Sequence, residues 1–131
     1  MLVRHYLISL VFFMSLPVFA QVKNAMIYFV PWEVETRFSY GPENVRQSAA
    51  VKTELRSEWL AQSFHDWLAG KQFQDTTWQK IGGLRLVVDL TLQDGTVKSY
   101  YASQFQLLDV STGQVRQIDD EFKARFSAIY K

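Results

Sequence analysis

The stretch LRLVVDLTLQDGTVKSYYA, residues 84–102, decides the fold of this 131-residue chain. Its first half alternates apolar and polar side chains, which is the pattern of a β-strand with one buried face. Asp94-Gly95 comes next, and this dipeptide is the short-range signal most typical of a tight β-hairpin. The stretch therefore predicts two antiparallel strands that are joined at Asp94-Gly95 and form the centre of a sheet.

The hairpin turn also predicts how the two strands align. Closure by a two-residue turn pairs Gln93 with Thr96 and, further along, Val88 with Tyr101. Because neighbouring side chains on a strand point to opposite faces, Tyr101 is expected in the core and Tyr100 on the second face. There Tyr100 would lie among polar and charged side chains, namely Arg85, Asp89, Thr91 and Lys98.

Apolar patterns on both sides of the hairpin predict further strands. Residues 25–40 are expected to form one long strand, bent at Pro31, whose first part is apolar on both faces and lies deep in the domain. Residues 45–55 fit a strand at even spacing, although Ala49 and Ala50 also suit a helix; we assign a strand. After the hairpin, strands are expected over residues 105–110 and 115–118.

Two amphipathic helices complete the predicted fold. The first is capped by Ser57 and carries apolar residues at helical spacing until Gly70, and the second is capped by Asp119 and continues towards the end of the sequence. Short hairpins and segregated helices are typical of an α+β domain. We expect a small single domain with a mainly antiparallel sheet of about five strands and both helices on one face.

Residues 1–20 have the features of a secretory signal peptide. A short polar start with Arg4 and His5 precedes an apolar run, and the segment ends in Val18-Phe19-Ala20. Cleavage after Ala20 would leave a single domain over residues 21–131 without a membrane anchor; a buried N-terminal helix is the less favoured alternative. The sequence has no cysteine, which favours the bacterial periplasm over other secreted locations.

Composition argues against several function classes. The 14 basic and 13 acidic residues leave no basic surplus for nucleic acid. After cleavage the only histidine is His65, so neither a zinc site nor another metal or cofactor site is expected. No nucleophile motif occurs, and Glu33 and Glu35, which could formally serve as paired carboxylates, are more typical of a solvated strand face. We therefore predict a protein that is not an enzyme.

Aromatic residues make up 15% of the chain and suggest a binding function. Adjacent pairs such as Trp59-Leu60 cannot both enter one core unless both faces are covered. Exposed aromatic side chains among charges would form a protein-binding surface, as in an inhibitor or immunity protein; a glycan or small-ligand module that stacks sugar on Trp78 or Tyr100 is the alternative. The predicted binding residues are Tyr100, Arg85, Asp89, Lys98, Glu33 and Glu35.

Overall fold

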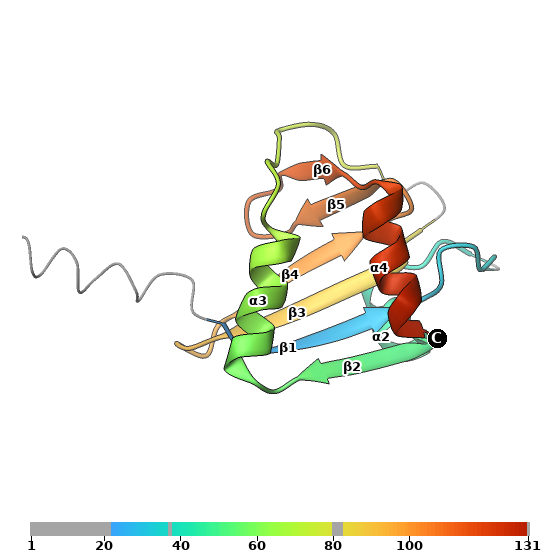
Figure 1. Cartoon of the computed structure of the whole chain (residues 1–131). Coiled ribbons are helices and arrows are strands. Elements are labelled where there is room, and N and C mark those ends of the chain that lie inside the picture. Colours follow the sequence, from blue (N-terminus) through green and yellow to red (C-terminus); the bar gives the residue numbers. More distant parts are fainter. Residues whose placement is uncertain (1–21, 37, 80–82, 131) are drawn as a thin grey trace, which may run out of the picture.

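The computed structural model describes residues 22–36, 38–79 and 83–130 (Figure 1). It shows an α+β fold with a six-stranded, fully antiparallel sheet in the order β2-β1-β3-β4-β5-β6, which confirms the predicted fold class. Residues 1–20, the predicted signal peptide, lie outside the described residues. The elements, in chain order, are β1 (Val22–Phe29), α2 (Pro42–Ser48), β2 (Val51–Leu55), α3 (Glu58–Leu68), β3 (Leu86–Leu92), β4 (Val97–Ala102), β5 (Gln106–Asp109), β6 (Val115–Gln117) and α4 (Asp120–Tyr130).

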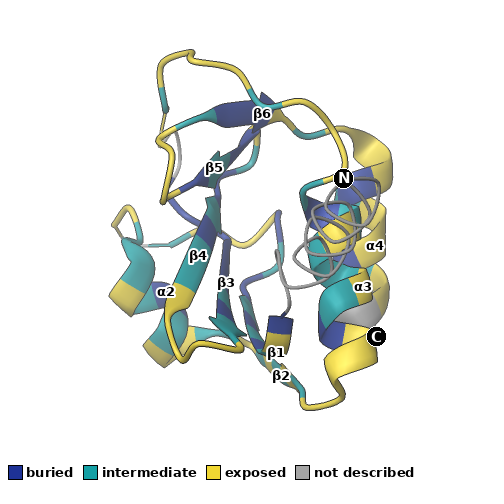
Figure 2. Cartoon of the chain, turned by 90° about the vertical axis from the view of Figure 1, so that its left-hand side faces the viewer, coloured by how far each residue is buried: buried dark blue, intermediate teal, exposed yellow. Residues whose placement is uncertain are grey.

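The two predicted helices, α3 and α4, lie on one face of the sheet and run in opposite directions (Figures 1 and 2). The Ser57 hydroxyl accepts a hydrogen bond from the Leu60 N–H, and Asp119 Oδ1 accepts one from the Phe122 N–H, so both predicted N-caps are confirmed. Their apolar faces meet the alternating inward side chains of β1 and β3. This helix-covered core includes Phe29, Leu86, Val88, Leu90, Ala61, Leu68, Phe122 and Phe126.

A third helix, α2, covers the opposite face of the sheet (Figure 2). Its Val45 is buried and packs with Val87 of β3 and with Val30, just after β1. The sequence predicted no helix there. Each face of the central strands therefore has its own core. Helices cover both faces, which explains why residues 25–30 are apolar on both sides.

The predicted long strand ends before Pro31. Trp32 turns into the helix-covered core, where its Nε1 donates to the Lys123 carbonyl at 3.0 Å, and the N–H of Val34 donates to the Pro31 carbonyl at 3.1 Å. The chain then passes to the opposite face, where the Tyr40 carbonyl accepts from the Leu84 N–H at 2.9 Å. The described part of residues 32–40 contains no strand, and Val34 and Phe38 of the alternating pattern are exposed, so the prediction of a strand there is wrong.

The ambiguous segment over residues 45–55 contains both kinds of element. Pro42 starts α2, where a missing N–H costs nothing, and the Asn44 side chain accepts from the Gly41 N–H at 2.9 Å. The helix ends at Ser48, and β2 begins at Val51 as an edge strand beside β1. The strand prediction is confirmed for residues 51–55 and wrong for residues 45–48.

The β3–β4 hairpin aligns one residue away from the predicted register. The Gly95 N–H donates to the Leu92 carbonyl and the Leu92 N–H to the Thr96 carbonyl, each at 2.9 Å, so the loop has three residues instead of two. As a result Val88 pairs with Tyr100 and not with Tyr101. A one-residue shift moves every side chain of a strand to the other face, which reverses the predicted positions of the two tyrosines.

Candidate functional site

Tyr100 does not face solvent. It is 1% exposed and lies in the helix-covered core, where its ring centroid is 6.1 Å from that of Phe73. Burial raises the pKa of Tyr100, although Lys98 opposes the shift. Tyr101 is half-buried on the α2 side instead. The prediction that Tyr100 faces away from the core is wrong, so the exposed aromatic surface built on it does not form.

The charged residues predicted beside Tyr100 are divided between the two faces. Arg85 is buried and its Nη2 donates to the Val34 carbonyl at 2.9 Å. Asp89 lies on the α2 side, whereas Lys98 pairs with Asp109 at 3.4 Å on the helix-covered side. These residues do not form one surface.

Asp89 belongs to a polar cluster that attaches α2 to the sheet. Arg46 of α2 donates to both carboxylate oxygens, at 3.0 Å and 2.9 Å, and the Ser99 hydroxyl donates at 2.6 Å. Burial alone would raise the pKa of Asp89, but the hydrogen bonds from Arg46 and Ser99 outweigh it and lower that pKa. The geometry is that of a structural ion pair between helix and sheet.

Glu33 and Glu35 are exposed in the segment between β1 and α2. Because no strand forms there, strand alternation does not place their carboxylates on one face. Among the described residues, no group of three or more His, Asp or Glu side chains could hold a metal ion. His65 is half-buried near the end of α3, with Nδ1 3.2 Å from the carboxylate of Asp66.

An apolar groove lies between α3 and α4, above β1 and β2. We call it the interhelical groove; its volume is about 570 Å³ and it is lined by Ile27, Thr53, Leu55, Leu60, Ser63, Phe64, Trp67, Arg125, Phe126 and Ala128. Trp59 and Leu60, at the start of α3, are 73% and 47% exposed. Both members of this adjacent pair thus remain accessible, and Leu60 is the one that lines the groove.

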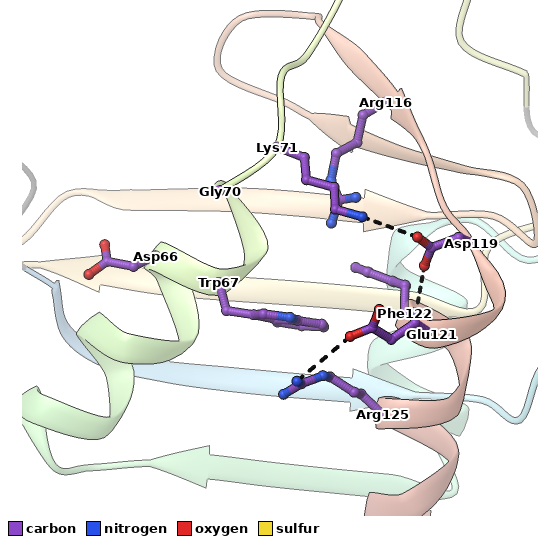
Figure 3. A pocket seen from close by; sticks show the side chains of 9 residues that line it. All are labelled: Asp66, Trp67, Gly70, Lys71, Arg116, Asp119, Glu121, Phe122 and Arg125. Carbon is purple, nitrogen blue, oxygen red and sulfur yellow. Dashed lines mark hydrogen bonds and ion pairs between the residues drawn. The ribbon is translucent and has the colours of Figure 1, made fainter.

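At its far end the groove continues into a charged pocket of about 330 Å³, between the end of α3 and the start of α4 (Figure 3). Trp67 and Arg125 line both cavities. The Trp67 and Phe122 rings stack at 5.2 Å between centroids, and the Arg125 guanidinium lies 5.4 Å from the Trp67 centroid. This stack forms the boundary between the apolar groove and the charged pocket.

The charges in this pocket are mostly paired. Lys71 Nζ is 3.1 Å from Asp119 Oδ2, and Arg125 is 3.9 Å from the Glu121 carboxylate (Figure 3). The backbone N–H of Phe122 and the ammonium of Lys71 lower the pKa of Asp119. Arg116, from β6, also lines the pocket, and no ion pair with it is found among the described residues.

In the sequence, the groove residues of α3 are recognisable only as the apolar stripe of the first predicted helix. Spacing shows that Leu60, Phe64 and Trp67 share one face of α3. It does not show how far α4 lies from α3, and this separation leaves part of the stripe accessible. The adjacency of Trp59 and Leu60 was the available signal, because two neighbouring residues cannot both enter one core unless both faces are covered.

Comparison with known proteins gives no relative from which a function could be transferred. No family model matches the chain, and no similar curated protein or solved structure was found. In the part of the chain that the structure describes, no helix is long and apolar enough to cross a membrane. The geometry of the molecule is therefore the basis for its functional interpretation.

Proposed function

We propose that this domain binds another protein, and that an amphipathic helix of the partner lies in the interhelical groove. One observation carries the proposal: an open groove between α3 and α4 is lined mainly by apolar side chains, which include Trp67 and the 47% exposed Leu60. Tryptophan is among the residues that contribute most to protein binding energy. An apolar groove between two helices suits the apolar face of a third helix.

The lining of the groove favours a partner helix that carries apolar residues and an acidic residue. Seven of its ten lining residues are apolar, and the charged one, Arg125, lies at the boundary with the charged pocket. A partner helix would bury Leu60 and Phe64 against its own apolar residues and place an acidic residue near Arg125. Burial of the exposed apolar side chains provides the driving force, and the charge at one end sets the orientation.

An inhibitor or immunity role in the periplasm, or after secretion, is the specific form of this proposal. It relies on the predicted signal peptide. Binding of a small ligand is the second candidate, because a cavity of about 570 Å³ is also within the usual range for small-molecule sites. If the first candidate is right, groove substitutions should weaken the binding of a protein. If the second is right, they should weaken the binding of a small ligand.

Affinity capture from an envelope extract, followed by binding measurements with the purified partner, tests the proposal. Leu60→Ala should weaken binding by about 1–2 kcal/mol, or roughly 5- to 30-fold, while the fold stays intact. Val97→Ala is the matched control, since Val97 is 61% exposed on β4, outside the groove. Equal binding by Leu60→Ala and the control Val97→Ala would exclude the groove as the interface.

A further inference from the structure

Arg116 is a buried cation that makes no direct ion pair among the described residues, although the carboxylate of Asp119 attracts it electrostatically. It is 7% exposed, and its Nε is buried without a hydrogen-bond acceptor. Its Nη2 donates to the Leu68 carbonyl at 3.4 Å, which is a long hydrogen bond. No described carboxylate lies within ion-pair distance of the guanidinium. A buried charge that lacks a direct ion pair is costly, which makes the site favourable for an anion.

Aromatic rings hold the guanidinium in position. Its central carbon is 5.0 Å from the Phe122 ring centroid and 5.9 Å from that of Phe73. Burial lowers the pKa of Arg116, although Asp119 opposes the shift. Arginine nevertheless remains protonated at physiological pH. The fixed guanidinium is thus preorganised to receive an oxyanion, which costs less than ordering a flexible side chain.

Lys71 and Arg116 are shared between the charged pocket and a second cavity. This polar pocket has a volume of about 430 Å³, and no acidic residue is found among the described residues that line it, which are Lys71, Gln72, Gln74, Thr76, Thr77, Gln79, Gln106, Val115, Arg116 and Gln117. On this side, the charges that line the pocket are both positive. In the charged pocket, Asp119 already binds Lys71 through Oδ2 and the Phe122 N–H through Oδ1.

The wall of the polar pocket is held in place by hydrogen bonds. The Gln74 N–H donates to the Val115 carbonyl at 2.7 Å, and the Val115 N–H donates back at 2.9 Å, so the loop after α3 is joined to β6. The Gln106 side chain accepts from the Gln79 N–H at 2.8 Å and donates to the Thr77 carbonyl at 3.2 Å. Hydrogen bonds within the fold therefore hold the wall of the pocket in a defined position.

We propose that Arg116 and Lys71 form an oxyanion-binding site that takes the carboxylate or phosphate group of a small polar ligand, whose remainder lies among the amide and hydroxyl groups of the polar pocket. Arginine can donate two hydrogen bonds to an oxyanion, and lysine adds a point charge. Glutamine and threonine side chains donate to and accept from hydroxyl groups, so a sugar acid or sugar phosphate has suitable chemistry. This site does not depend on protein binding in the interhelical groove.

Isothermal calorimetry on the full domain at constant ionic strength tests the site with four probes: inorganic phosphate, glucose 6-phosphate, glucuronate and glucose. Saturable binding is expected for glucose 6-phosphate or glucuronate. Tighter binding of glucose 6-phosphate would identify phosphate as the preferred group, and tighter binding of glucuronate would identify carboxylate. Inorganic phosphate should bind more weakly, because it leaves the amide groups unused. Glucose should not bind measurably. No binding of any anionic probe, or equal affinity for phosphate and glucose 6-phosphate, would overturn the proposal.

Substitutions separate this site from a general effect of positive charge. Lys71→Gln should weaken the affinity of the best probe about tenfold, as expected for a lost hydrogen bond to a charged group. The Lys71 side chain is 64% exposed, so the melting temperature of the free domain should change little. Lys52→Gln, an exposed cation on β2, is the control and should bind like the wild type. An equal loss in both variants, or in neither, would contradict a site at Lys71.

Arg116→Lys serves as a second variant, since it keeps the charge but loses the fork-shaped donor. It should weaken binding of the best probe at least about tenfold, provided that circular dichroism shows a folded domain. If this variant does not fold, Lys71→Gln still decides the outcome. Wild-type affinity in folded Arg116→Lys would show that the guanidinium is not part of the site.

Discussion

Tyr100 fills the helix-covered core, and its neighbour Tyr101 lies half-buried on the α2 side. We expect Tyr100→Ala to lower the free energy of unfolding by about 3–5 kcal/mol, because the lost ring leaves a cavity among close-packed side chains. Tyr101→Ala should cost clearly less, since part of that ring already contacts water. Urea denaturation measures both. A larger loss for Tyr101→Ala would contradict the observed register of β4.

The Arg46–Asp89 pair makes stability depend on pH. The pKa of Asp89 is lower in the folded state than its usual value of about 3.9. The ionised carboxylate therefore stabilises the fold above that usual value, and this contribution is lost as the pH falls through the folded-state pKa. Asp89→Asn should cost about 1–3 kcal/mol at pH 7, the range for hydrogen bonds to charged groups.

Chemical denaturation of Asp89→Asn between pH 7 and pH 2.5 checks this contribution. The difference from the wild type should shrink at the acidic end, where the wild-type carboxylate is protonated. A double-mutant cycle with Arg46→Met isolates the pair. A difference that stays constant over the whole pH range would show that the charge of Asp89 does not stabilise the fold.

The hairpin between β3 and β4 depends on the backbone conformation of Gly95. Its φ is +87°, and a Cβ atom there would meet nothing within 4 Å, so a substitution would be strained by conformation and not by contact. Gly95→Val should therefore lower the free energy of unfolding by about 1–3 kcal/mol. Gly95→Asn is the control, since asparagine tolerates positive φ, and should cost less. Equal thermal stability of the wild type and Gly95→Val would contradict this turn conformation.

At the scale of the whole molecule, the described fold begins at β1, directly after the predicted cleavage point. Val22 is buried at the start of β1, and its N–H donates to the Gln62 side chain at 2.7 Å. Cleavage after Ala20 would therefore leave every described element complete. We expect the exported protein to start at Gln21, which mass spectrometry would show. An exported, folded protein that still begins at Met1 would refute the cleavage.

Local patterns in the sequence were sufficient for most elements. The stripe of α3, the caps Ser57 and Asp119 and the alternation in residues 84–92 depend on neighbours within one or two turns or pleats, so they could be predicted without the fold. The α+β class followed from their order. The faces of Tyr100 and Tyr101 were predicted wrongly, because exposure depends on the register, and a loop longer by one residue reversed it.

Only the tertiary structure decided what covers each surface. The second face of the sheet is covered by α2, a helix of seven residues whose short pattern also resembled a strand. The opening between α3 and α4, and the meeting of Lys71 with Arg116, join residues that are 45 or more positions apart in the chain. Periodicity reports which side of an element is apolar; the distance between elements determines whether that side becomes core or a groove.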